Sequence, residues 1–552
     1  MAGDMAWDRE VDVVVVGSGA AGLSAALSAS VGGAEVLILE KSDRVGGTTA
    51  MSGGGTWVPG NHHMLAAGCE DSIEDALAYI RAVMPPGWEE DEGPLWRTYL
   101  EEAPAMLAFV EHHSPLRFTL IRYPDLKPDA KGSRDFGRLL SPALLSRNLL
   151  GPWRDRVRKS IRPQLFTYDE MILGPLLKRP VRTIIRMAPT LLHRILTRRV
   201  GMGASLVVGL LKGCLDRGCA IETLTPAAEL VIEGGERGRV VGVAATLGGE
   251  RRMIRARKGV VLATGGFEWD PAMLSEHFPT DWILLGSPRT NTGDGHRMAA
   301  RAGAVFAHMG EGTIYPVSAT TYEGQRSAFP NTQFDRAHCI LVDRTGRRFA
   351  CEGQRNAVTA AISARDPATG RSLHAPAWRI FDAQFAAKNP FALRLTRWVP
   401  GQLHTAATVE ALARLIDVDP AGLRATVERF NRFAENGVDE DFHRGESAIE
   451  RHAEDAAGSD TRNPSLGTIA KPPFHATPYY LGLLGTKGGP RTNARAQALR
   501  ADGTVIAGLY CAGSIMANFF GTAAVASGST LGPFMTWGYI AGQNLLRENQ
   551  PG

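Results

Sequence analysis

Near the N-terminus, an apolar run changes, after a glycine-rich turn, into an apolar pattern of helical period. The segment VDVVVVGSGAAGLSAALSAS starts with valines, as expected for a strand that is buried on both faces of a parallel sheet. Leucine and alanine then recur at helical spacing, and a second apolar strand, EVLILEK, follows. Strand, turn, helix and strand in this order predict a βαβ unit at the start of an α/β fold.

Strand and helix patterns alternate again at later points of the chain. The segment 201–245 predicts a helix, a strand, a turn and a strand, and KGVVLATGGF predicts a buried strand that ends at Ala263. NTGDGHRMAARAGA predicts a helix that starts near Asp294, and GLYCAGS predicts a last strand that ends near Gly513. In 306–474 the segment ATVEALARLIDVDPAGLRATVERFNRFAENG has helical spacing instead. A chain of 552 residues exceeds one ordinary core, so we expect at least two domains.

The glycines of the first turn form the pattern Gly17-x-Gly19-x-x-Gly22. In this pattern Gly17 permits the tight turn, Gly19 lets the backbone approach a pyrophosphate, and Gly22 allows helix and strand to pack closely. The second strand ends on Glu40, at the spacing from which an acid hydrogen-bonds a ribose hydroxyl. The glycines alone would fit an ordinary turn, but the whole unit predicts a bound dinucleotide.

Composition and charge exclude several other classes of protein. The net charge of +4 is small for 552 residues, so we expect no nucleic-acid partner. The six cysteines are scattered without zinc spacing, which predicts reduced thiols, no metal site and a cytoplasmic location. The N-terminus is acidic before its apolar run, and no stretch approaches the roughly 20 apolar residues of a membrane span. We therefore expect neither a signal peptide nor a transmembrane helix.

A second loop of small residues, KSDRVGGTTAMSGGGTWVPGN, follows Glu40 directly. The sequence of this loop resembles the flavoprotein-subunit family of fumarate reductase and succinate dehydrogenase, and within it the 3-ketosteroid dehydrogenases. Two motifs near the C-terminus, LGTKGGPRT and STLGPFMTWGYIAG, show the same resemblance. The resemblance implies an α/β fold, with a Rossmann-like FAD-binding domain and an inserted α+β cap domain that carries the catalytic site. It places the FAD-binding domain in 1–305, with a helical insertion at about 125–200, the cap in 306–474 and the return to the FAD-binding domain in 475–552.

The resemblance identifies the dinucleotide as FAD. We expect non-covalent binding, because no histidine of the early loop matches the family's attachment site. Only one glycine motif of this kind is present, so no separate NAD(P)H domain is expected and electrons should pass to an external acceptor such as a quinone. The expected FAD-binding residues are Gly17, Gly19, Ala20, Ala21, Gly22, Glu40, Lys41, Gly46, Gly47, Thr48, Thr49, Ser52, Gly53, Gly54, Ala228, Ala263, Thr264, Gly265, Asp294, Gly513, Ser529, Thr530 and Leu531.

The residue that moves a proton in the family is missing from its usual places. In the family a base removes a proton next to a ketone, while a hydride leaves the neighbouring carbon for the flavin. The tyrosine that 3-ketosteroid 1-dehydrogenases carry near the last motif would fall at Ala524, and a second family tyrosine would fall at Asn356. Gly528 keeps a backbone N–H for the ketone oxygen. The candidate acids or bases are Tyr322, Tyr479 and, with preference, Tyr123, Tyr315 and Tyr480.

Three functions are compatible with these motifs. The favoured one is an FAD-dependent dehydrogenase that introduces a C=C bond next to the ketone of an apolar, cyclic, steroid-like substrate. The second is an ene-reductase of the fumarate-reductase type, for which Lys487, Arg491 and Arg495 would supply cations, although that family's essential arginine is absent. The third is a flavoprotein that has lost the family activity.

The segment 176–199 is strongly basic and contains no acid. Leucine and isoleucine alternate there with Lys178, Arg179, Arg182, Arg186, Arg194, Arg198 and Arg199. One interpretation is a helical pair with a solvated basic face. The other is a helix that lies on an anionic membrane, which would make the protein peripheral on the inner membrane face.

Overall fold

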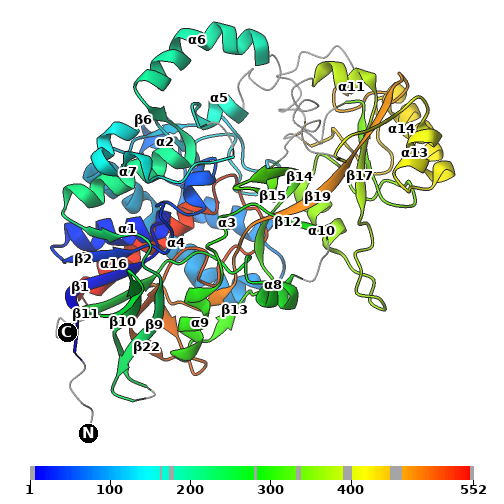
Figure 1. The fold of residues 1–552 in the computed structure, drawn as a ribbon. Helices are drawn as coiled ribbons and strands as arrows, with labels where there is room; N and C mark the ends of the chain where they lie inside the picture. Colours follow the sequence, from blue (N-terminus) through cyan, green and yellow to red (C-terminus); the bar gives the residue numbers. More distant parts are fainter. Residues whose placement is uncertain are drawn as a thin grey trace.

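Two β-sheets with their helices make up the two parts of the molecule (Figure 1). The computed structural model describes residues 6–161, 164–172, 180–235, 237–278, 282–330, 337–389, 401–447, 450 and 463–547. Segments from both ends of the chain share the first part, where the blue and red ribbons of Figure 1 lie together. The first part is therefore built from both the N-terminal and the C-terminal segments of the chain.

An eight-stranded sheet forms the centre of the first part, with the strand order β21-β22-β11-β1-β2-β8, with β10 attached to β11 and with β9 attached to β10. The pairs of β1 with β2, β1 with β11, β2 with β8 and β11 with β22 are parallel. Val13, Val14 and Val15 of β1 have no exposed surface, as the continuous valine run predicts. The strands are β1 (Arg9–Val16), β2 (Val36–Leu39), β8 (Ala220–Glu222), β9 (Ala227–Glu233), β10 (Arg239–Leu247), β11 (Glu250–Leu262), β21 (Gln497–Leu499) and β22 (Val505–Cys511).

Helices from distant parts of the sequence cover this sheet. α1 follows the first glycine motif, and α16, near the C-terminus, packs against it at very short range. A Cβ atom on Gly538 of α16 would lie 2.2 Å from the carbonyl oxygen of Ala21, so glycine is required at this crossing. The helices of this part are α1 (Ala20–Val31), η1 (Thr49–Met51), α2 (His62–Ala66), α3 (Ile73–Val83), α4 (Trp88–His113), α7 (Met202–Asp216), α8 (Pro271–His277), α9 (Asp294–Arg301) and α16 (Leu531–Arg547).

The predicted insertion at about 125–200 is mixed rather than helical. Its short strands pair with two strands that precede it, β3 (Thr56–Trp57) and β4 (Phe118–Leu120), or with each other. α6 lies at the top of Figure 1, away from the two sheets. The elements of the insertion are β5 (Leu139–Pro142), β6 (Leu145–Ser146), η2 (Arg147–Asp155), α5 (Tyr168–Ile172), α6 (Pro180–Leu196) and β7 (Arg199–Val200). Across the residues that the structure describes, no helix is both long enough and apolar enough to span a bilayer.

The second part, the cap, is built on a seven-stranded sheet with the order β15-β14-β19-β17-β16 and with β12 and β18 attached to β19. Its strands are β12 (Ile283–Leu285), β14 (Gly312–Tyr322), β15 (Gln325–Pro330), β16 (Cys339–Val342), β17 (Ala377–Phe381), β18 (His404–Ala406) and β19 (Phe474–Thr486), and the short pair β13 (Phe306–Ala307) and β20 (Gly489–Pro490) lies outside this sheet. Its helices are α10 (Arg355–Ser363), α11 (Ala383–Lys388), α13 (Val409–Leu415) and α14 (Pro420–Asn436).

The cap sheet extends beyond the boundaries expected from the sequence. β19 pairs with β14, β17, β18 and β12, so 474–486 belongs to the cap sheet although a return to the FAD-binding domain was expected from 475. β12, at 283–285, joins the same sheet from within the segment 1–305. The difference arises because domain membership is decided here by main-chain hydrogen bonds to distant strands, which the local pattern of a long apolar strand does not reveal.

Candidate active site

One cavity lies along the carboxyl ends of the parallel strands and extends to the cap. Its lining includes Val16 at the end of β1, Leu39 at the end of β2, and the residues that follow β11 and β22. From the cap it receives Tyr315 of β14 and Ala328 of β15. The cavity encloses about 310 Å³. Ligands of open α/β sheets bind at this edge, outside the carboxyl ends of the strands.

In the first glycine motif, Gly17 and Gly22 are required by the packing of the protein itself, whereas Gly19 leaves room for a ligand. Gly17 has φ of +108°, and a Cβ atom there would lie 2.2 Å from the carbonyl oxygen of Ala263. A Cβ atom on Gly22 would lie 2.0 Å from the carbonyl oxygen of Gly17. A Cβ atom on Gly19, in contrast, would meet only Thr49 Oγ1 at 3.7 Å. Gly19 therefore leaves space in the cavity that the protein does not fill, as a pyrophosphate contact requires.

The N-terminus of α1 opens on this space. Gly19 is the N-cap residue of α1 and has no side chain to cap it, while Thr49 Oγ1 accepts a hydrogen bond from Ala20 N at 3.0 Å. The helix N-terminus favours negative charge, since its first N–H groups lack partners within the helix. The residues present therefore fit the diphosphate of FAD at this end of the cavity.

Three charged groups line the same end, Glu40, Lys41 and Asp294. Glu40 accepts hydrogen bonds from Ser18 Oγ at 2.5 Å and from Ser42 N at 2.8 Å, so its carboxylate is held in one position on the cavity wall. Lys41 Nζ lies 2.6 Å from Asp294 Oδ2. Burial favours a higher pKa for Asp294, but the hydrogen bond and charge of Lys41 outweigh it and hold the pKa below the ordinary value. Glu40 is therefore positioned for the ribose contact predicted from the sequence.

Most of the residues predicted to bind FAD line the cavity, and four do not. Gly22 lies in α1 against Gly17, Gly46 lies in a loop against Val207, and Ser529 is buried with its hydroxyl donating to the carbonyl oxygen of Ala526 at 2.8 Å. Ala228 is exposed, whereas Ala227, one position earlier on β9, lines the cavity. The predicted residues that line it are Gly17, Gly19, Ala20, Ala21, Glu40, Lys41, Gly47, Thr48, Thr49, Ser52, Gly53, Gly54, Ala263, Thr264, Gly265, Asp294, Gly513, Thr530 and Leu531.

Gly528 lies at the cavity just before the N-terminus of α16. Its φ is +88°, and a Cβ atom would lie 2.7 Å from the backbone nitrogen of Trp57. Its carbonyl oxygen accepts a hydrogen bond from that nitrogen at 3.2 Å. Within the described part of the chain, the N–H of Gly528 has no hydrogen-bond acceptor. This N–H is therefore free to contact a ligand, and only glycine fits the position.

Of the three preferred tyrosines, Tyr315 alone lines the cavity. Tyr480, which is 8% exposed, stacks on Trp282 with ring centroids 4.7 Å apart, and its hydroxyl accepts a hydrogen bond from Arg326 Nη2 at 2.6 Å. Tyr123 follows β4 and lies outside the lining. The assignments of Tyr480 and Tyr123 to the catalytic site are therefore not supported by their positions. The strand that contains Tyr480, β19, reaches the cavity at Leu484 and Gly485 instead.

The structure adds Tyr168, which the sequence analysis did not select. Tyr168 begins α5 and lines the cavity, and its Cε2 atom would lie 3.0 Å from a Cβ atom on Gly53. It comes from the insertion at about 125–200, where the resemblance is weakest, so no motif marked it. The two positions at which the resemblance places family tyrosines are occupied by Ala524 and Asn356, and neither residue has an aromatic ring. Tyr315 and Tyr168 are thus the two tyrosines on the cavity wall.

Comparisons with known proteins agree with this geometry. The family model of the FAD binding domain matches residues 12–531. The chain is 36% identical over 548 residues to 4-oxocyclohexanecarboxylate 2-dehydrogenase of Sinomonas cyclohexanicum, with 97% of this chain and 93% of the relative covered. It is 34% identical over 574 residues to 3-oxosteroid 1-dehydrogenase of Mycolicibacterium smegmatis, with 97% and 96% covered.

A solved structure shows the same relationship. The crystal structure of 3-ketosteroid delta1-dehydrogenase from Sterolibacterium denitrificans, in complex with 1,4-androstadiene-3,17-dione, matches with a TM-score of 0.87 at 32% identity. The match covers 98% of this chain and 100% of that chain.

The fold and the cavity define an FAD-dependent oxidoreductase. The chain belongs to the FAD binding domain family and, within it, to the branch of the 3-ketosteroid dehydrogenases, which act on CH–CH groups next to a ketone. The family, the fold class and the cofactor predicted from the sequence are confirmed.

Proposed function

We propose that the protein dehydrogenates an apolar cyclic ketone, steroid-like in character, at the C–C bond next to its carbonyl group. One observation carries this proposal: Tyr315 of the cap and Gly528 of the FAD-binding domain line the same cavity as the FAD cradle. The relatives support the substrate class, since the two named above act on a cyclic oxo acid and on 3-oxosteroids.

Different residues of the chain serve different steps of the proposed reaction. Bound FAD supplies the acceptor for the hydride that leaves the substrate. The N–H of Gly528 polarises the ketone oxygen, which acidifies the protons of the adjacent carbon. Tyr315 moves one of these protons as the general base. Apolar side chains of the cavity wall, Ile161, Ala328 and Leu484, keep water from the reacting carbons.

The alternative ene-reductase would need cations that bind a dicarboxylate. Lys487 Nζ instead donates a hydrogen bond to the carbonyl oxygen of Gly521 at 2.6 Å, and Arg491 lies 3.4 Å from Asp91. Neither of them lines the cavity, and Arg495 does not either. In the described part of the chain Lys41, at the FAD diphosphate end, is the one lysine or arginine on the cavity wall. A neutral substrate fits this lining better than a dianion.

A direct assay separates the proposed functions. The oxidised holoenzyme is mixed anaerobically with 3-ketosteroids and with smaller cyclic ketones, and the absorbance of the flavin is followed. The proposal predicts bleaching by at least one ketone and no oxidation of a reduced dye by fumarate. Bleaching by no ketone would contradict it, and dye oxidation by fumarate would favour the ene-reductase. The non-covalent state of FAD and the cytoplasmic location stay predictions.

We further propose that α6 rests on an anionic membrane, where apolar substrates and quinone acceptors collect. Six large apolar side chains of α6 have exposed fractions from 45% to 72%. They recur three and four positions apart and therefore form one face of the helix. They are Val181, Ile184, Ile185, Leu192, Ile195 and Leu196. A solvated basic face does not explain this exposure, whereas insertion into the headgroup layer does.

The charges beside this face are positive. Arg182 and Arg186 are exposed on its flank, and the segment 176–199 contains no acid. Arg194, counted among the membrane-facing cations from the sequence, is 8% exposed and pairs with Glu170 at 2.7 Å, because an acid from outside the segment reaches it. Arg198 is half exposed, 3.6 Å from Asp155. Leu176, Leu177, Lys178 and Arg179 lie outside the described residues. Arg182 and Arg186 are therefore the cations of α6 that a lipid surface would meet, and Arg199 in β7 is exposed as well.

A further inference from the structure

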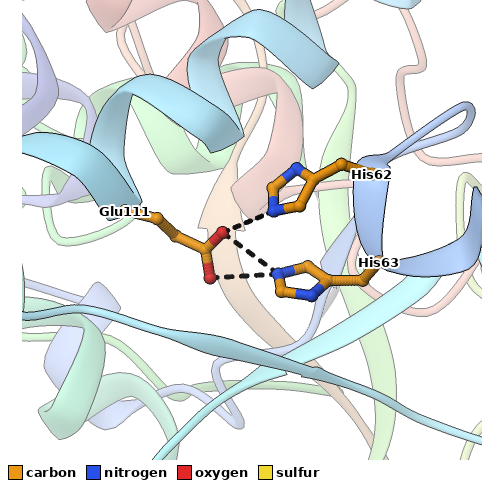
Figure 2. Close-up of side chains that lie close together, drawn as sticks. All are labelled: His62, His63 and Glu111. Atoms are coloured by element: carbon orange, nitrogen blue, oxygen red, sulfur yellow. Dashed lines mark hydrogen bonds and ion pairs between the residues drawn. The ribbon is translucent and has the colours of Figure 1, made fainter. Parts of the chain in front are cut away.

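Two histidines and one carboxylate converge on one point at a distance from the FAD cavity (Figure 2). His62 and His63 begin α2, and Glu111 lies in the last turn of α4. His62 Nε2 is 2.8 Å from Glu111 Oε2, and His63 Nε2 is 3.0 Å from Glu111 Oε1. The three ligand atoms lie within 4.8 Å of one another. None of the three residues lines the FAD cavity.

We propose that His62, His63 and Glu111 form a binding site for a divalent transition-metal ion such as Zn²⁺. Imidazole nitrogens and carboxylate oxygens bind Zn²⁺ at about 2.0–2.2 Å, and three protein ligands with water in the fourth position are a common arrangement. Tetrahedral bonds of that length place neighbouring ligand atoms about 3.3 Å apart. The separations of 2.8 and 3.0 Å seen here need to widen by only a few tenths of an ångström.

The surroundings hold the carboxylate and the start of α2 in place. Glu111 Oε1 accepts a hydrogen bond from the backbone N–H of Phe118 at 2.8 Å, which fixes the orientation of the carboxylate. Asn61 caps α2 by accepting from Met64 N, and its own amide donates to the carbonyl oxygen of Val58 at 2.7 Å. Hydrogen bonds from outside the site thus hold the carboxylate and the start of the helix that carries both histidines.

Electrostatics at this place favour a cation on balance. Glu111 carries a negative charge, and the C-terminal end of the 26-residue helix α4 adds the negative end of its dipole. Arg117, on the same hollow, opposes a cation, but its Nη1 donates to the carbonyl oxygens of Glu111 at 2.5 Å, Leu116 at 2.6 Å and Ser114 at 2.9 Å. These carbonyl groups hold its guanidinium on the main chain in the last turn of α4 and directly after it.

A metal ion here would connect α2 to α4, beside the segment of the FAD-binding domain that lies against Gly528. The hollow that contains the three ligands opens to solvent, and His62 is 47% exposed, so an ion has an entry path. α2 follows β3, whose Trp57 lies against Gly528. α4 also supports this wall, because the Tyr99 hydroxyl donates to the carbonyl oxygen of Trp57. The bound ion would brace the segment that positions Gly528, and it would take no part in the reaction itself.

Titration calorimetry on metal-free holoenzyme tests the proposal. ZnCl₂ should bind with one ion per chain at the site, and MgCl₂ should not, since Mg²⁺ prefers oxygen ligands. Loss of an outer-shell partner alone costs about 10–100-fold in metal affinity, so loss of a ligand in His63→Ala or Glu111→Gln should cost at least as much. Glu111→Gln keeps an acceptor for the Phe118 N–H, and an unchanged FAD spectrum shows that each variant is folded.

His443→Ala is the matched control. His443 is an exposed histidine, and its Nδ1 lies 3.3 Å from a glutamate oxygen, as in a simple surface ion pair. Its loss should leave zinc binding unchanged. The proposal is overturned if wild-type holoenzyme binds no Zn²⁺, or if His63→Ala and Glu111→Gln bind it as tightly as the wild type does. A ketone dehydrogenase without zinc binding would refute this site and leave the proposed activity intact.

Discussion

The guanidinium carbon of Arg355 lies 4.2 Å from the ring centroid of Tyr315. Arg355 is the first residue of α10, and Tyr315 is the cap tyrosine on the cavity wall. A cation over a ring at this distance fixes the position of the ring and stabilises the anionic form of the phenol, which is the form that accepts a proton. The contact therefore links α10 of the cap to the residue that we propose as the general base.

Arg355→Gln should slow reduction of the flavin by substrate. A cation–π contact contributes about 1 kcal/mol, which corresponds to roughly a 5-fold change in rate. Arg326→Gln is a matched control, because Arg326 lies 4.9 Å from the ring of Tyr480, a tyrosine outside the cavity. Stopped-flow reduction measures both variants. Equal effects of the two substitutions would show that Arg355 acts only through the stability of the cap.

Gly19→Ala should fold and lose FAD affinity. A Cβ atom at Gly19 stands 3.7 Å from its nearest neighbour in the chain, so the cost falls on the ligand that must approach the backbone. The larger side chain of Gly19→Val should give a colourless protein. Gly17→Ala should instead destabilise the fold itself, since its Cβ atom would lie 2.2 Å from a carbonyl oxygen. FAD content and circular dichroism distinguish the two effects, and stoichiometric yellow FAD in Gly19→Val would refute the placement of the diphosphate.

Binding to anionic vesicles should depend on α6. Arg182→Gln combined with Arg186→Gln should weaken binding by roughly 30-fold, at about 1 kcal/mol for each cation near the surface. Ile185→Asp should weaken it as well, and salt should weaken wild-type binding through screening. Leu373→Asp is the control, since Leu373 is 52% exposed at another place. Co-sedimentation measures binding, and a wild type that stays in the supernatant with anionic lipid at low salt would end the membrane proposal.

Lys487 should make stability depend on pH above neutrality. Burial lowers the pKa of Lys487 from its ordinary value of 10.5 to about 8. Between these values the unfolded chain holds a proton that the folded chain lacks, so the free energy of unfolding rises with pH in this window. From pH 7.5 to 9.5 the wild type should gain about 2 kcal/mol relative to Lys487→Met. Urea unfolding measures the difference, with Lys471→Met as an exposed control, and parallel pH profiles for wild type and Lys487→Met would contradict the shift.

The FAD end of the site was predictable because its residues act within short stretches of chain. Gly17, Gly19 and Glu40 belong to one βαβ unit, where the order of strand, turn and helix already specifies the ligand. Ala227 lines the cavity, whereas the predicted Ala228 is exposed, because the pairing of β9 decides which alanine faces the cavity. The motifs therefore predict where the cradle lies, and the contacts of its single residues with FAD stay predictions.

The substrate end was less predictable because it depends on contacts between distant segments. Tyr168 reaches the cavity from α5 and packs on Gly53, and no local sequence pattern predicts this contact. Arg194 was assigned to a lipid-facing surface, but it pairs with Glu170, which lies 24 positions earlier in the chain. Tyr480 lies in a motif that resembles the family, and yet its ring stacks on Trp282. Such side-chain partners are set by tertiary packing, which sequence periodicity does not encode.

The most direct test of the account is the rate at which a ketone substrate reduces the flavin in Tyr315→Phe under anaerobic conditions. Loss of a general base costs roughly 10²–10⁴-fold, so the rate constant of flavin reduction should fall by that factor. The FAD spectrum should stay that of the wild type, and Tyr480→Phe should reduce at nearly the wild-type rate. Undiminished reduction in Tyr315→Phe, with the large loss found in Tyr168→Phe instead, would contradict the assignment of the base.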